Sequence, residues 1–139
     1  IIVTPEKLKI SYLAHVILPL HRDIDSKQEQ KRHEEKIGTT GKGIGPAYTD
    51  KVARYGLRIM DLLSKQKIRK KISKNLRFSE VNEDVIDNVV DQYYEFGQTL
   101  KPFMIDSSLY VNQAIDSKKP SIIEIEGDVD ALAPTAWSK

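Results

Sequence analysis

The stretch that decides the fold is residues 36–58, which read KIGTTGKGIGPAYTDKVARYGLR. Its first part, from Gly38 to Pro46, holds four glycines, two threonines and a lysine in nine residues. Glycines let backbone N–H groups approach an anion closely, and the start of a following helix adds a favourable dipole. Hydroxyl groups and an ammonium group complete a phosphate cradle. On spacing alone, a phosphate site and a merely flexible connection are equally good interpretations.

Two familiar nucleotide-binding motifs do not fit this loop. A Walker A loop requires Ser or Thr after Gly-Lys, whereas Gly43 follows Lys42. A dinucleotide-binding fingerprint requires a third glycine where Pro46 stands, and the residues before the loop are not typical of a strand. The sequence therefore leaves an anion site open but excludes both motifs.

The second part of the stretch predicts a helix through Asp50, Val52 and Arg54, with Pro46 in its first turn. Lys51, Arg54 and Arg58 are three and four residues apart, so we expect them on one side of this helix. Arginine suits the bidentate recognition of phosphate. A solvated basic face is the alternative, and it is favoured for Lys51 and Arg58.

The flanking sequence predicts further helices and two short strands. The expected strands are residues 8–12, which alternate apolar and polar, and residues 121–127; the expected helices cover 14–35, 60–76, 82–101 and 106–115. Pro19 must lie in the first turn of its helix or separate two pieces. The two strands are too far apart in the sequence to form a sheet of their own, so we expect them to belong to a larger sheet.

The composition is that of one soluble globular domain. The chain has 139 residues, of which 40% are hydrophobic and 30% charged. It has no cysteine, which excludes disulfides, thiolate catalysis and Cys-ligated zinc and suits a cytoplasmic protein. No apolar run is long enough to cross a bilayer, so no membrane partner is expected. We expect His15, His21 and His33 to be helix residues rather than bases or metal ligands.

One segment is strongly basic although the whole chain carries a net charge of only +2. Seven of the thirteen residues from Lys65 to Arg77 are Lys or Arg. A solvated helix face is the favoured interpretation, with Ile68, Ile72 and Leu76 as its buried stripe. A nucleic-acid-binding helix is the weaker one, because no aromatic residue interleaves the charges to stack on bases.

Residues 36–58 resemble the signature segment of the adenylosuccinate synthetases almost residue for residue. The preceding helix is similar as well, at Ile10-Ser11, Ala14-His15, Pro19, His21, Asp25 and Glu29. Asp61-Leu62-Leu63, Asp106 and the segment ending at Glu126-Gly127 extend the likeness, which covers about residues 8–127. The resemblance implies an α/β fold, in which this chain is a helix-rich internal portion of a P-loop-NTPase-like parallel-sheet enzyme. Residues 1–127 would be its central region, and residues 128–139 a divergent tail.

The resemblance also implies an activity. Enzymes of this family are ligases of purine nucleotide biosynthesis that join L-aspartate to IMP with GTP and Mg²⁺. GTP phosphorylates the 6-oxygen of IMP, and the aspartate amine then displaces the phosphate. Carried over, Thr40 would bind the IMP phosphate with help from Thr39 and the loop amides. Arg54 would reach the IMP of the partner subunit in a homodimer, and Lys42 stands where the family has a basic residue near the substrates.

The resemblance further implies that this chain is incomplete as a catalyst. The family's glycine-rich GTP loop, with its catalytic Asp and Mg²⁺ ligand, and its catalytic His are expected outside the chain. The family's IMP-contacting glutamine after Glu126-Gly127 is replaced, because the chain continues Asp128-Val129-Asp130. We therefore expect no catalytic residue and no metal ligand here. A non-catalytic helical dimerisation module is the alternative function.

Overall fold

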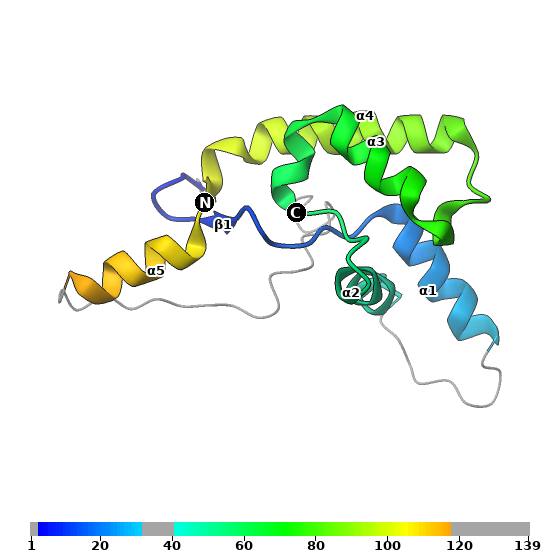
Figure 1. Ribbon diagram of the computed structural model, residues 1–139, viewed down its shortest axis with the longest axis horizontal. Coiled ribbons are helices and arrows are strands. Elements are labelled where there is room, and N and C mark those ends of the chain that lie inside the picture. Colours follow the sequence, from blue (N-terminus) through cyan, green and yellow to red (C-terminus); the bar gives the residue numbers. More distant parts are fainter. Residues whose placement is uncertain (1–2, 32–40, 118–139) are drawn as a thin grey trace.

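The computed structural model describes residues 3–31 and 41–117, and helices dominate this part of the chain. The elements are β1 (Ile10–Ser11), α1 (Pro19–Lys31), α2 (Ile44–Val52), the 3-10 helix η1 (Ile59–Leu63), α3 (Lys65–Lys74), the 3-10 helix η2 (Leu76–Phe78), α4 (Glu83–Leu100), the 3-10 helix η3 (Lys101–Phe103), β2 (Met104–Ile105) and α5 (Ser107–Asp116). In Figure 1 the extended segment after β1 runs through the middle, with α3 and α4 on one side and α1 and α2 on the other.

The two short strands pair in parallel, with Ile10 opposite Met104 and Ser11 opposite Ile105. The strand expected over residues 8–12 is therefore confirmed in its centre, and it pairs with β2, a segment that was not predicted as a strand. The segment 121–127 lies outside the described residues, and β2 comes from the short apolar piece before Asp106. A pair of two-residue strands is marginal by itself, so most of the order must come from helix packing. The helix-rich α/β character is confirmed.

Helix α1 begins at Pro19 and not at Ala14, so the prediction of a helix from Ala14 is wrong. Proline suits the first helical position, because its fixed φ is helical and its missing N–H would have no partner there. The residues before it are extended: Val16 N donates to Leu57 O at 2.8 Å, and Ile59 N donates to Ala14 O at 2.8 Å. His15 forms an isolated antiparallel bridge with Arg58, so it is not a helix residue. His21 lies in α1 as expected, and His33 lies outside the described residues.

The helix expected over residues 60–76 is divided at Ser64. Its hydroxyl accepts the N–H of Lys67, so Ser64 is the N-cap of α3, and η1 precedes it. Ile68 and Ile72 are buried as predicted. Leu76 is 80% exposed, so its place in the buried stripe is wrong. The reason is that α3 ends before the extended residue Asn75, which breaks the helical spacing.

Helix α4 agrees with the sequence prediction. Asn82 caps it by accepting the N–H of Asp84 at 2.8 Å, and its buried face includes Ile86, Val90 and Tyr93. The Tyr93 hydroxyl donates to Ile17 O at 2.8 Å, and burial raises the pKa of this phenol. Gly97 lies against η1, where an added Cβ would be 2.4 Å from Leu62 O. Together α3, α4, η1 and the segment after β1 enclose the apolar core.

The start of α5 is tied to the segment after β1. Asp106 caps α5 by accepting the N–H of Leu109 at 3.0 Å, and the Tyr12 hydroxyl donates to its other oxygen at 2.9 Å. The Leu109 bond, followed by the Tyr12 bond, holds the pKa of Asp106 below its ordinary value. In the described ranges 3–31 and 41–117, no helix is both long and apolar enough to span a bilayer.

A buried carboxylate, Asp50, joins α1, α2 and the segment that follows α3. It is 1% exposed. His21 Nδ1 accepts the N–H of Leu18 at 2.9 Å, so Nε2 carries the ring proton and donates to Asp50 Oδ2 at 3.1 Å. Asn75 Nδ2 donates to the same oxygen. Arg77 Nε lies 3.5 Å from Oδ1, which is an ion pair rather than a hydrogen bond. His21, Asn75 and Arg77 thus compensate the Asp50 carboxylate for the solvation by water that it loses on burial.

Replacing Gly97 with Ala tests the close contact between α4 and η1. We expect the free energy of unfolding to fall by about 2 kcal/mol, because the new methyl group meets backbone atoms that have little freedom to move. Gly45→Ala in α2 is the matched control, since nothing lies within 4 Å of its added Cβ. It should raise the free energy of unfolding by up to about 1 kcal/mol. Urea unfolding measures both; equal effects would contradict the contact.

Replacing Asp50 with Ala tests the buried carboxylate. We expect a loss of about 3 kcal/mol in the free energy of unfolding, because His21 and Asn75 lose their acceptor and Arg77 loses its ion-pair partner. Asp23→Ala, at an exposed position of α1, should change stability by less than about 0.5 kcal/mol. Chemical denaturation followed by circular dichroism gives both values. A loss at Asp50 as small as that at Asp23 would show that the carboxylate does not hold these segments together.

Candidate functional site: the glycine loop and helix α2

The end of the glycine loop is fixed to α1 at Gly43. This residue has φ of 77°, and an added Cβ would lie 2.8 Å from Arg22 N and 2.9 Å from His21 C. Its N–H donates to Asp25 Oδ2 at 3.0 Å, and Asp25 is buried. Glycine is required here for its conformation and for space. The loop therefore enters α2 from a fixed point, and spacing arguments did not identify Asp25 as its anchor.

Only one of the predicted phosphate ligands of the loop lies within the described residues. Thr39 and Thr40 lie outside the described residues, so their roles stay predictions. Lys42 is described and exposed, one residue before the anchored Gly43. Pro46 lies in the first turn of α2, as predicted, and is buried with Ala47. The structure thus places one predicted ligand at the surface where the loop meets the helix.

Helix α2 ends at Val52, and Arg54 occupies the turn that follows it. Arg54 has φ of 67°, and its N–H donates to Lys51 O at 3.1 Å. The N–H groups of Tyr55 and Gly56 both donate to the carbonyl oxygen of Asp50 at 2.9 Å. The prediction that Lys51, Arg54 and Arg58 lie on one side of a helix is therefore wrong. The chain reverses at Arg54 before Arg58 is reached.

The conformation of Arg54 is unusual for its residue type. Left-handed backbone is favourable for Gly and tolerable for Asn, but it costs other residues about 1–2 kcal/mol. Arg54 is exposed, and among residues 3–31 and 41–117 no carboxylate forms an ion pair with it. A strained residue whose side chain forms no ion pair within the described residues suggests a function for that side chain. The turn presents the guanidinium to the surroundings beside α2.

Helix α2 carries a row of exposed apolar side chains. Ile44, Tyr48 and Val52 are four residues apart, and Val52 is 69% exposed. Tyr55, in the turn after the helix, adds a second exposed ring. The opposite face is buried through Ala47 and Asp50. An apolar row of this kind, beside an exposed arginine, is typical of a protein–protein contact.

The described residues do not fit a metal site. Over residues 3–31 and 41–117, no three His, Asp or Glu side chains gather closely enough to bind an ion. Magnesium prefers carboxylate oxygens and substrate phosphates. No step involving a metal is therefore assigned to these residues.

Comparison with known proteins gives a consistent result. The family model of adenylosuccinate synthetase matches residues 1–129. Adenylosuccinate synthetases from Listeria monocytogenes serovar 1/2a and Streptococcus gordonii are each 43% identical over 130 residues, which is 88% of this chain and 30% of each relative. A solved structure of fully ligated adenylosuccinate synthetase from Plasmodium falciparum is 28% identical with a TM-score of 0.70, covering 83% of this chain and 28% of that one.

The chain thus spans about 30% of the length of the relatives it matches. The matched region includes the loop, α2 and the turn at Arg54, where the structure has its buried anchors and its strained arginine. Sequence and fold agree on the same assignment. The chain belongs to the adenylosuccinate synthetase family.

Proposed function

We propose that residues 1–127 form the IMP-phosphate and dimer-contact region of a GTP-dependent enzyme that joins L-aspartate to IMP in purine nucleotide biosynthesis. The observation that carries the proposal is Arg54, an exposed arginine held in left-handed backbone within the family's signature segment. GTP and Mg²⁺ belong to the complete enzyme, and this chain alone supplies no phosphoryl transfer. Residues 128–139 are a tail of unassigned role. A cytoplasmic location suits these soluble substrates.

The loop positions the phosphate group of IMP. Thr40, with Thr39 and the loop amides, would bind the phosphate oxygens, and Lys42 would add positive charge. The bond from Gly43 to Asp25 supports this role, since it fixes the end of the loop relative to α1. A fixed cradle lowers the entropy that is lost when substrate is oriented for reaction. These residues bind and orient substrate, and they move no proton.

Arg54 would bind the IMP of the partner subunit in a homodimer. The two ends of α2 support this geometry, because the loop precedes the helix and Arg54 follows it, with the apolar row between them. In a twofold dimer the same row faces its own copy, so each arginine is directed toward the other subunit. The alternative function, a non-catalytic dimerisation module, would use the same apolar row but would bind no nucleotide. Measuring IMP binding therefore distinguishes the alternative from the proposed function.

Replacing the proposed ligands tests IMP binding. Thr40→Ala and Arg54→Gly should each weaken IMP binding by about thirtyfold, which corresponds to about 2 kcal/mol for a lost charge-assisted hydrogen bond. Glycine at position 54 removes the guanidinium and relieves the positive φ, so stability should stay equal or rise by about 0.5 kcal/mol. Calorimetry measures the affinity and thermal melting the stability.

Lys27→Gln, at an exposed position of α1, is the control for loss of one positive charge. It should leave the affinity for IMP within about twofold. If the two ligand variants bind IMP as well as the original chain does, Thr40 and Arg54 are not part of the site. If the original chain itself binds no IMP, the alternative dimerisation module is favoured.

Mixing the variants tests the dimer. In a mixed dimer of Thr40→Ala and Arg54→Gly subunits, one site has both ligands intact and the other has neither. Random mixing should therefore restore about a quarter of the high-affinity IMP sites, because half of the dimers are mixed. Titration with IMP counts these sites.

Val52→Glu is the companion variant, since it places a charge within the exposed row of α2. We expect it to convert dimers to monomers in sedimentation experiments and to abolish the rescue when present in both variants. The interface would be ruled out if high-affinity IMP sites were restored in mixtures that contain no dimers. It would also be ruled out if Val52→Glu left the dimers intact.

A further inference from the structure

A basic pocket lies between α3 and the turn after α2, next to Arg54. Its volume is about 370 Å³. The lining residues are Arg54, Tyr55, Asp61, Lys67, Lys70, Lys71 and Lys74. Five of these side chains are cationic and one is a carboxylate. A pocket of this size falls in the range that holds a small ligand.

The four lysines are positioned by the helical repeat of α3. Positions 67, 70, 71 and 74 follow the three- and four-residue spacing of one helix face. Two of the other cations face α4 instead: Arg69 pairs with Glu83 and Asp87, and Lys65 pairs with Asp91 at 2.8 Å. The third, Arg77, pairs with the buried Asp50. Within α3, the basic run is thus divided between a face that α4 neutralises and a face that lines the pocket.

One lysine of the pocket is also neutralised. Lys71 Nζ donates to Asp61 Oδ2 at 2.7 Å and to Gly56 O at 2.9 Å. Asp61 is buried, and its Oδ2 also accepts the N–H of Arg58. This bonded pair joins α3 to the turn between α2 and η1, so the two walls of the pocket are held at a fixed separation.

The remaining cations, Arg54, Lys67, Lys70 and Lys74, have no acidic partner among the described residues. Like charges around one concave surface repel one another, and they raise the local concentration of anions. A single carboxylate or monophosphate would balance only part of this charge. A chain of two or three phosphate groups offers several oxygens for the ammonium groups and for the arginine fork.

We propose that this pocket binds a small ligand carrying a pyrophosphate or triphosphate group. Lys67, Lys70 and Lys74 bind the phosphate oxygens, and Arg54 closes the side of the pocket next to α2. The exposed ring of Tyr55 offers a flat apolar surface to an attached base. Among the described residues, Lys42 of the loop does not line this pocket, and Arg54 is the one residue that the pocket shares with the site proposed for IMP.

Nucleic acid is disfavoured as the ligand by the shape of this site. A single strand needs a groove that follows its backbone and aromatic rings that stack on successive bases. Here the charge surrounds one pocket, and Tyr55 is the one aromatic side chain among the described residues that line it.

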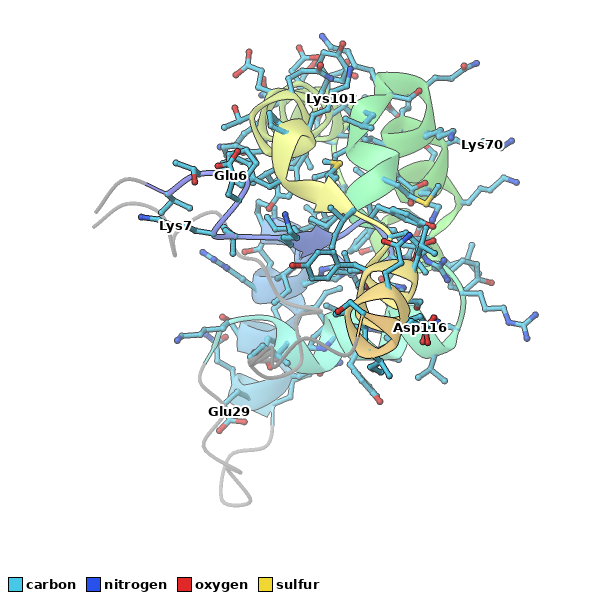
Figure 2. All side chains as sticks on the ribbon, turned by 90° about the vertical axis from the view of Figure 1, so that its left-hand side faces the viewer. Glu6, Lys7, Glu29, Lys70, Lys101 and Asp116 are labelled. Atoms are coloured by element: carbon cyan, nitrogen blue, oxygen red, sulfur yellow. The ribbon has the colours of Figure 1, made fainter. Side chains whose placement is uncertain are left out.

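Inorganic tripolyphosphate is a suitable probe, titrated into the 139-residue chain by calorimetry. The pocket variant carries Lys67→Gln, Lys70→Gln and Lys74→Gln. The control carries Lys7→Gln, Lys27→Gln and Lys101→Gln at exposed positions, with the same loss of charge. Figure 2 shows Lys7 on the side of the molecule opposite Lys70. We expect one saturable site, weakened at least about tenfold in the pocket variant and less than about twofold in the control.

Three outcomes would overturn the proposal. Equal weakening in both triple variants would mean that net charge, and not the pocket, attracts the anion. Absence of saturable binding in the original chain would exclude the site. Tight binding of a 20-nucleotide single-stranded RNA that depends on the three lysines, without tripolyphosphate binding, would replace the small ligand with nucleic acid.

Two controls keep the test independent. Circular dichroism melting shows whether the exposed substitutions preserve the fold, as expected. Thr40→Ala should keep its affinity for tripolyphosphate while its affinity for IMP falls. The tripolyphosphate titration therefore tests the pocket, and the IMP titration tests the proposed function, independently of each other. Loss of tripolyphosphate binding in Thr40→Ala would assign the anion to the loop and contradict the pocket.

Discussion

The side chain of Asp50 is the point where three segments distant in the sequence meet. Its carboxylate binds His21 of α1, Asn75 after α3 and, by charge, Arg77. Its carbonyl oxygen accepts the N–H groups of Tyr55 and Gly56, which ends α2. The position of Arg54 therefore depends on Asp50, since the turn that holds the arginine is closed on the same residue that anchors α2. A buried carboxylate is tolerated at this point because it is multiply bonded.

Helix α2 is fixed at both of its ends, and this has a functional consequence. At its start Gly43 is bonded to Asp25, and near its end Asp50 is bonded to His21, so α1 holds both ends. A loop and a turn carried by one short, anchored helix keep a constant separation. The free side of the helix is apolar at Tyr48 and Val52, which suits a second subunit. In the proposed dimer, one element would set the distance between the phosphate cradle of one subunit and the arginine that reaches the other.

Local features of the fold were predictable from the sequence, and long-range ones were not. Asn82 at the start of α4 acts through residues within one turn, so a cap of this kind can be recognised, and Pro19 was limited in advance to a first turn or a break. The extended segment at His15 depends on its pairing with Arg58, which no local pattern indicates. The same holds for β2, which pairs with β1 across most of the chain. The predicted ligand Arg54 was recognised by family resemblance, but its left-handed turn follows from the buried anchor at Asp50.

The basic segment 65–77 shows why a charge count does not determine function. Arg69 and Lys65 meet carboxylates at positions 83, 87 and 91, which are spaced along one face of α4. Such exposed pairs stabilise the fold little, but they direct these two cations toward α4. Within residues 3–31 and 41–117, the lysines on the pocket face of α3 meet no carboxylate except Asp61, so their charge stays available. The near-neutral total of the chain is thus compatible with a local excess of positive charge, and that excess lies beside the arginine that leaves α2.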